Sequence, residues 1–302
     1  MTLSRRHFLA GTGALGVAAC TTPGGSDGLG PLRDELAAAE LRGNGTLSVS
    51  ILDTGSGRSL SHAGYARVAH CSSFKLSLAA LVMQRIRAGT LDANETLRWS
   101  ETDLVEYSPV TQGWTARGAT PLELAEATQK TSDNTAANVL LKRLGGPEEL
   151  TRFWRALGDE SSRLDRYEPE LNHVPPGEIM DTTTPDAMAM TVAKLLTGDV
   201  LAPEDRRMLR QWTIDTQTGL QRVRAGLPQG WVAGDKTGTS LWPDMRSIYV
   251  DVGFAQPPGR PPIVFAAYFR SAGTDATVDP VAQNVFAEVG TVLARFAALA
   301  GS

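Results

Sequence analysis

Hydrophobic residues alternate with polar ones near both ends of the chain and recur at helical spacing through its middle. Leu47, Val49 and Ile51 alternate with serines, and the turn-forming stretch 53–57 follows, which predicts a hairpin with one face buried. Three further strands are predicted over 231–236, 247–254 and 263–269. Helices are predicted over 31–41, 121–129, 135–144, 147–157, 185–196, 203–212 and 281–298.

This order of elements predicts an α+β fold. Strands at both ends with helices between them imply an antiparallel sheet built from both termini and flanked by helices, with an inserted all-helical lobe. We place the α/β lobe at about 31–66 and 216–302 and the helical lobe at about 67–215. Together they form one domain, 31–302, with a site expected in the cleft where the lobes meet.

The first twenty residues indicate export. Arg5-Arg6 opens a twin-arginine signal, and the apolar stretch 10–19 is too short to span a bilayer. It ends at Val17-Ala18-Ala19-Cys20, which resembles the lipobox whose cysteine carries the lipid of a bacterial lipoprotein. Residues 21–30 would be a flexible tether. We expect a periplasmic protein anchored to a membrane through lipid on Cys20, the alternative being a signal that is simply cleaved.

Composition narrows the function classes. The 302 residues are 42% hydrophobic and 21% charged, as in ordinary globular proteins, and a net charge of -4 argues against nucleic acid as a partner. The four histidines lack metal-ligand spacing, so no metal site is predicted. A Gly-x-Gly-x-x-Gly match at 11–16 lies inside the export signal with no strand before it, so no dinucleotide cofactor is expected.

Three short motifs carry candidate chemistry. Ser72-Ser73-Phe74-Lys75 heads an apolar run, and because residues three apart share a helix face, the hydroxyl of Ser72 and the amine of Lys75 would meet as nucleophile and base. Ser132-Asp133-Asn134 lies between two predicted helices, and Lys236-Thr237-Gly238-Thr239 ends a predicted strand. Alone, these motifs would be a solvated helical turn, a helix cap and a strand end. Their joint occurrence in this order points to catalysis.

In this order the motifs resemble the signature of the serine β-lactamase and penicillin-binding protein superfamily. The stretch Arg166-Tyr167-Glu168-Pro169-Glu170-Leu171-Asn172 is similar to the loop that gives class A β-lactamases an extra carboxylate, and 105–111, 181–185 and 222–228 extend the similarity. The resemblance implies a monomer that hydrolyses penicillins and cephalosporins through a serine acyl-enzyme, without metal or cofactor, and so confers antibiotic resistance.

Two alternatives share this resemblance: a penicillin-binding DD-peptidase, and a β-lactam sensor without turnover. Glu168 and Asn172 argue against the peptidase, since a carboxylate and an amide on this loop supply deacylation. The sensor is disfavoured because the sequence shows no transmembrane or signalling segment beyond the N-terminal signal.

The resemblance also implies catalytic roles. Ser72 is the nucleophile, and the backbone N–H groups of Ser72 and Thr239 form the oxyanion hole. The acylation base is either Lys75, if burial or the charge of Lys236 lowers its pKa, or Glu168 acting through a water. Glu168 then activates the deacylating water, which Asn172 helps to hold. Ser132 relays a proton to the leaving nitrogen.

Substrate contacts are implied in the same way. Tyr107 lines the entrance, Asn134 binds the substrate's side-chain amide, and the substrate carboxylate is bound by Lys236, Thr237, Thr239 and Arg222. Gly238 would let a substrate backbone lie close to the strand edge. Arg166 and Asp181 form the ion pair that closes the loop bearing Glu168.

Some positions depart from the family pattern. Cys71 stands where some relatives form a disulfide, but the partner position here is Ser240, so Cys71 is expected to be a free thiol. The segment 241–247 is unlike the family, and Met180 replaces a commonly charged residue. His70 is expected to have a packing or hydrogen-bonding role.

Overall fold

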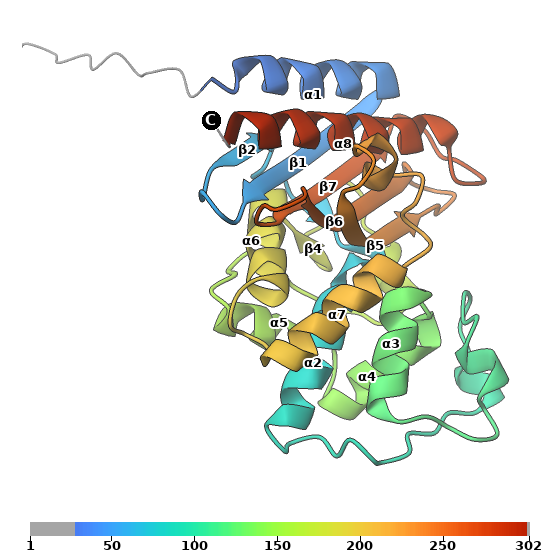
Figure 1. The fold of residues 1–302 in the computed structure, drawn as a ribbon. Coiled ribbons are helices and arrows are strands. Elements are labelled where there is room, and N and C mark those ends of the chain that lie inside the picture. Colours follow the sequence, from blue (N-terminus) through green and yellow to red (C-terminus); the bar gives the residue numbers. More distant parts are fainter. Residues whose placement is uncertain (1–27, 301–302) are drawn as a thin grey trace, which may run out of the picture.

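The computed structural model describes residues 28–300, which form one antiparallel sheet with helices on both faces (Figure 1). The strand order is β2-β1-β7-β6-β5. The strands are β1 (Gly45–Asp53), β2 (Ser59–His62), β5 (Val232–Ser240), β6 (Ile248–Gln256) and β7 (Ile263–Ser271). A sheet built from both termini is therefore confirmed. The export signal, Cys20 and the tether up to residue 27 lie outside the described residues.

The helices form two layers. In Figure 1, α1 (Gly30–Gly43) and α8 (Pro280–Ala300) lie above the sheet, and the inserted helices lie below it. The inserted helices are α2 (Phe74–Arg87), α3 (Pro121–Lys130), α4 (Asn134–Leu144), α5 (Pro147–Ala156), α6 (Pro185–Leu196) and α7 (Pro203–Asp215). Each predicted helix is present, with its ends shifted by three residues or fewer. Within residues 28–300, none is long and apolar enough to cross a bilayer.

Short elements join these layers. The strand β3 (Val68–Ala69) pairs with β4 (Thr182–Thr183), and the 3-10 turns are η1 (Cys71–Ser73), η2 (Glu101–Asp103), η3 (Thr111–Gly113), η4 (Glu170–Asn172) and η5 (Val223–Gly226). The hydrophobic pattern predicted none of them, because elements of two to four residues are too short to show a period.

The helix α2 is the centre of the inserted lobe. Every residue from Phe74 to Met83 is buried, since other helices and the sheet surround it. A helix buried on all sides must be apolar all round, which the run from Leu76 to Val82 largely provides. Lys75 is the charged exception, and a buried lysine is rare unless it is paired.

One expectation about β1 is wrong. The sequence predicts a half-buried strand with its serines in solvent, but Ser48 and Ser50 are only 6% and 4% exposed. Val49 and Ile51 pack with α1 and α8, whereas the serine face is covered by the 63–69 segment and by α6. Alternation marks the two faces of a strand but cannot show that both are covered.

Candidate active site

Ser72 lies in η1, one turn before α2, and its hydroxyl meets the amine of Lys75. Lys75 Nζ donates to Ser72 Oγ at 2.9 Å and to Ser132 O at 2.9 Å, and it also donates to Asn134 Oδ1. The predicted pairing of Ser72 with Lys75 is therefore present.

Lys75 is completely buried beside a carboxylate. Its Nζ lies 2.9 Å from Glu168 Oε1, and both side chains are fully buried. Burial lowers the pKa of Lys75, and the contact with Glu168 opposes that shift in part. The lowered pKa makes a neutral, proton-accepting Lys75 more accessible than in an exposed lysine.

Glu168 faces the same hydroxyl from the loop between α5 and β4. Its Oε1 lies 3.3 Å from Ser72 Oγ, and its Oε2 accepts a hydrogen bond from Asn172 Nδ2. Asn138 of α4 holds the Glu168 backbone from both sides, since its Oδ1 accepts from Glu168 N at 2.9 Å and its Nδ2 donates to Glu168 O at 2.8 Å. The peptide bond Glu168-Pro169 is cis.

The two ends of this loop are joined by Asp181. Its fully buried carboxylate accepts from Asp165 N at 2.7 Å, Arg166 N at 3.0 Å and Arg166 Nε at 2.5 Å. Its backbone oxygen accepts from His70 N at 3.0 Å, two residues before the nucleophile. The predicted pair of Arg166 and Asp181 is present and links the loop to the catalytic turn.

Ser132 reaches both lysines from the loop between α3 and α4. Lys236 Nζ donates to Ser132 Oγ at 3.0 Å, and Lys75 Nζ lies 3.5 Å from the same oxygen. Asp133 fixes this loop as the N-cap of α4, because its carboxylate accepts from Ala136 N, from Val110 N and from the N–H and hydroxyl of Thr111. Ser132 has a left-handed φ of 61°, which this network holds.

The edge strand β5 forms the opposite wall. Lys236 is completely buried, and burial, followed by the positive charge of Lys75, places its pKa well below that of an ordinary lysine. Gly238 also lets the catalytic turn approach this strand closely. A Cβ at Gly238 would lie 2.8 Å from Ser72 N and 3.1 Å from His70 O, so the glycine admits the protein's own catalytic turn.

Arg222 lies behind this strand and is held rigidly. Its Nη1 donates to Gly238 O at 2.8 Å and to Val250 O at 2.5 Å, and its Nη2 donates to Thr239 Oγ1 at 2.6 Å. Burial lowers the pKa of Arg222, and no carboxylate within residues 28–300 forms an ion pair with it. The positive charge of Arg222 is thus held next to the hydroxyl of Thr239 on β5.

These walls enclose a cleft of about 470 Å³. Ser72, Ser132, Asn134, Asn172, Arg222 and Thr237, Gly238 and Thr239 line it, together with Tyr107. Tyr107 is 57% exposed at the rim, with a left-handed φ of 61°. The structure thus brings the predicted substrate-facing residues to one cleft, except for Lys236, which is buried beside it together with Lys75 and Glu168.

The remaining candidates lie outside the cleft. His70 stacks on Trp154 at 4.7 Å, and burial lowers its pKa to about 3, so it packs as a neutral ring. Cys71 is a buried free thiol whose pKa burial raises to about 12. Among residues 28–300, no group of three or more His, Cys, Asp or Glu side chains could hold a metal ion.

The segment that departs from the family pattern contacts the loop of Glu168. Asp244 Oδ2 lies 3.1 Å from His173 Nε2, and the ring of Trp242 meets that of His173 edge-on at 5.1 Å. Ser240 Oγ donates to Asn172 O at 2.8 Å. We call this group of contacts the β5–β6 latch.

Sequence reasoning missed three residues that support the site: Asn138, Ser240 and His173. Asn138 carries a faint signal, because an amide on the buried face of α4 requires partners. Nothing in the sequence pairs Ser240 or His173 with distant segments.

Arranged in this way, the cleft can perform acyl transfer. It offers a nucleophile hydrogen-bonded to a buried amine, a carboxylate beside both, and a cationic wall for an anionic substrate.

Comparisons with known proteins agree with this chemistry. Residues 31–297 match a family model described as "Beta-lactamase enzyme family". The chain is 43% identical over 245 residues to Beta-lactamase AST-1 of Nocardia asteroides, which spans 80% of this chain and 77% of that protein. It is 42% identical over 233 residues to the carbapenem-hydrolyzing beta-lactamase KPC of Klebsiella oxytoca, spanning 76% of this chain and 78% of that protein.

Solved structures show the same likeness. An ancestral (GNCA) class A beta-lactamase superposes with a TM-score of 0.83 at 45% identity, covering 88% of this chain and 99% of that one. A beta-lactamase from Burkholderia vietnamiensis gives a TM-score of 0.82 at 40% identity, with coverages of 88% and 96%.

Proposed function

The chain belongs to the β-lactamase enzyme family, as a class A serine β-lactamase, and from this we propose that Ser72 opens the β-lactam amide and that Glu168 releases the product. The activity is hydrolysis of β-lactams, which confers antibiotic resistance. Penicillins are the primary substrates, and cephalosporins are the second class.

Acylation begins with attack of Ser72 Oγ on the lactam carbonyl carbon. The hydroxyl proton passes to Lys75 or, through a water, to Glu168. The developing oxyanion is stabilised by the N–H groups of Ser72 and Thr239. As the C–N bond breaks, the lactam nitrogen takes a proton from Ser132 Oγ, which Lys75 and Lys236 can restore because both contact that hydroxyl.

Deacylation uses the opposite side of the cleft. Asn172 Oδ1 is buried and has no hydrogen-bond partner within residues 28–300, whereas its Nδ2 binds Glu168. An oriented acceptor beside a carboxylate can hold a water, one proton on each group. Glu168 takes a proton as the water oxygen attacks the ester carbon. When the bond between that carbon and Ser72 Oγ breaks, a proton from Glu168, directly or by way of Lys75, restores the hydroxyl of Ser72.

Substrate is oriented by its charge. The ammonium of Lys236, the hydroxyls of Thr237 and Thr239 and the guanidinium of Arg222 bind the carboxylate, and Asn134 binds the side-chain amide. Arg222 acts mainly by presenting Thr239 Oγ1, since its guanidinium is already bonded to that hydroxyl.

The observation that carries the proposal is the triangle of Ser72 Oγ, Lys75 Nζ and Glu168 Oε1, with sides of 2.9, 2.9 and 3.3 Å, at the wall of the cleft. The experiment is intact-protein mass after mixing with excess benzylpenicillin, while lactam absorbance is followed. The parent should turn over without a lasting adduct, and Glu168→Ala should accumulate one penicillin mass on Ser72. A parent that keeps the adduct for hours without turnover would be a penicillin-binding peptidase or a sensor.

We also propose that the enzyme is exported to the periplasm, anchored through lipid on Cys20, and monomeric. The twin arginines and the Val17-Ala18-Ala19-Cys20 stretch support export and lipidation. In cells making the full chain, the enzyme should fractionate with membranes, and Cys20→Ser should move it to the soluble periplasmic fraction. A parent protein already soluble after signal removal would contradict anchorage. Light scattering of the lipid-free protein should give the mass of one chain.

A further inference from the structure

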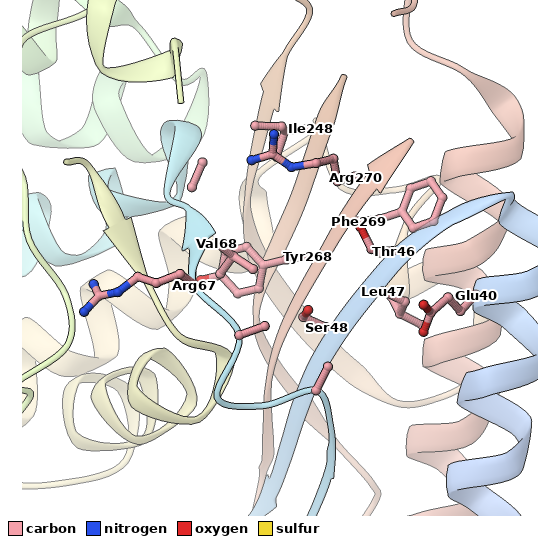
Figure 2. Close-up of a pocket in the computed structure, with 13 residues that line it drawn as sticks. Glu40, Thr46, Leu47, Ser48, Arg67, Val68, Ile248, Tyr268, Phe269 and Arg270 are labelled. Carbon is pink, nitrogen blue, oxygen red and sulfur yellow. The ribbon is translucent and has the colours of Figure 1, made fainter. Parts of the chain in front are cut away.

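A second cavity lies behind the catalytic turn, on the inner face of the sheet (Figure 2). It encloses about 250 Å³ between the ends of β1, β6 and β7 and the segment 63–69. That space is large enough for several waters or for one molecule of roughly the size of benzoate. Its lining includes none of the residues assigned above to catalysis or substrate binding.

Polar groups on two adjacent strands face this space. Thr46 pairs with Arg270 and Ser48 with Tyr268, so the four side chains form two rows on one face of the sheet. Ser48 is buried in the wall of the cavity, whereas Thr46 is exposed at its edge. Both hydroxyls can therefore donate a hydrogen bond to a molecule in this space.

Arg270 supplies the charge at one end of the cavity. Its Nη2 donates to Val174 O at 3.1 Å, but its Nη1 is buried without a partner, and no carboxylate of residues 28–300 forms an ion pair with it. In Figure 2 its guanidinium extends over Ile248 at the edge of the cavity. A guanidinium without a carboxylate in such a place favours an anion with two acceptor oxygens.

The other charged lining residues are already engaged. Arg67 Nη1 donates to Ser161 O at 2.6 Å and to Thr182 Oγ1 at 3.1 Å, and its guanidinium points away from the cavity in Figure 2. Glu40 Oε2 lies 2.5 Å from His62 Nε2. The remaining walls are apolar: the ring of Tyr268, Val68 and the methyl groups of Ala63, Ala66 and Ala69.

We propose that this cavity binds a small monoanion with an apolar body, of the class of aryl or short-chain carboxylates. Its carboxylate lies on the guanidinium of Arg270, with the hydroxyls of Thr46 and Ser48 beside it. Its apolar part packs on the ring of Tyr268 and on Val68. Because Val68 belongs to β3, which pairs with β4 and runs directly into η1, the ligand touches the segment that carries Ser72.

The test is a titration of the purified, isotope-labelled enzyme with sodium benzoate, followed by amide NMR, with benzamide as the neutral probe of the same shape. A ligand of this size should bind with about millimolar affinity. Benzoate should shift the amides of Thr46, Ser48 and Tyr268 saturably, and benzamide should bind at least about tenfold more weakly.

Variants assign the site. Arg270→Gln should weaken benzoate about tenfold or more, whereas Arg246→Gln, a neighbouring exposed arginine, should leave it unchanged. Ala66→Phe, a loop substitution that fills the cavity without touching the charge, should abolish binding and keeps the test valid if Arg270→Gln fails to fold. Shifts confined to Gly238 and Thr239 would mean that benzoate occupies only the catalytic cleft. That result, or equal binding by Arg270→Gln, would overturn the proposal and leave the cavity as a site for water.

Discussion

The Asp181→Asn substitution tests how firmly the loop of Glu168 must be held. The Asp181 carboxylate is completely buried and accepts three hydrogen bonds, two from the backbone N–H groups of Asp165 and Arg166 and one from Arg166 Nε. An asparagine can keep its oxygen toward the two backbone groups. Its amide nitrogen then faces Arg166 Nε, and two donors oppose each other.

The cost follows from the contacts. Hydrogen bonds to a charged group contribute about 1.5–3 kcal/mol, and breaking a fully buried ion pair costs about 3–5 kcal/mol. The Arg166 side chain is 25% exposed, and its Nη2 keeps a hydrogen bond to His173 O, so water and that bond recover part of the loss. We therefore expect the free energy of unfolding to fall by about 2–3 kcal/mol, which lowers Tm by roughly 4–10 °C in a domain of this size.

The loss falls mainly on deacylation. Asn138 still holds the backbone of Glu168, but the loop end at Asp181 and its bond to His70 N loosen together. A loss of about 1.4 kcal/mol in the positioning of Glu168 is a tenfold loss of rate. Benzylpenicillin turnover should fall at least about tenfold, with acyl-enzyme visible by intact mass during steady state.

The matched control is Glu170→Gln, which removes an exposed carboxylate from the same loop. No hydrogen bond to the Glu170 side chain is present within residues 28–300, so thermal unfolding and turnover should match the parent. If Asp181→Asn also melts and turns over like the parent, the pair with Arg166 does not position the loop.

Four further substitutions test the other contacts separately. Burial lowers the pKa of Lys236, and the ammonium that binds the substrate carboxylate is the low-pH form, so binding is present below that pKa and lost above it. The value of kcat/KM should therefore fall with rising pH well before 10.5. Lys236→Arg should move this alkaline limb of the pH profile up by about one unit or more. An alkaline limb that Lys236→Arg leaves in place would assign it to another group. Asn138→Ala removes both hydrogen bonds to the Glu168 backbone, so the free energy of unfolding measured in urea should fall by about 2–4 kcal/mol and acyl-enzyme should accumulate. A variant as stable as the parent would show that these two hydrogen bonds do not hold the loop. His173→Ala opens the β5–β6 latch, whose partly exposed pair contributes about 0.2–1 kcal/mol, so stopped-flow deacylation should slow by no more than about fivefold, and Asp244→Asn should match it.

The sequence predicts the parts of the site that depend on short-range geometry. Ser72 and Lys75 meet because residues three apart share a face, and the helix boundaries follow from prolines and caps such as Thr120 and Asp133. These signals lie within a few residues of the feature they specify. The resemblance to a known family supplied the grouping of the three motifs, which no periodicity could give.

The rest depends on contacts between segments far apart in sequence. Asn138 lies 30 residues from Glu168, and Ser240 lies 68 residues from Asn172. Their partners are set only when the sheet and the inserted lobe pack together. The left-handed φ of Ser132 and Tyr107 is likewise imposed by surrounding contacts, because neither residue type favours that region on its own.

To decide which residue is the acylation base, the geometry of the site and the protonation of Lys75 must be considered together. Lys75 and Glu168 contact each other and both face Ser72 Oγ, so the geometry allows either residue to take the hydroxyl proton. Glu168 raises the pKa of Lys75 against the lowering by burial. When Glu168→Ala removes that contact, burial alone acts on Lys75, its pKa falls further, and more of it is neutral at pH 7. The variant therefore holds more of its lysine in the neutral, proton-accepting form than the parent does. Acylation of this variant shows that Lys75 can accept the proton, but it does not show that Lys75 does so in the parent.

Comparison of the pH dependence of acylation in both proteins resolves this, because a parent that uses Lys75 should show an acidic limb that moves to lower pH in Glu168→Ala. A limb that disappears with the carboxylate assigns the step to Glu168.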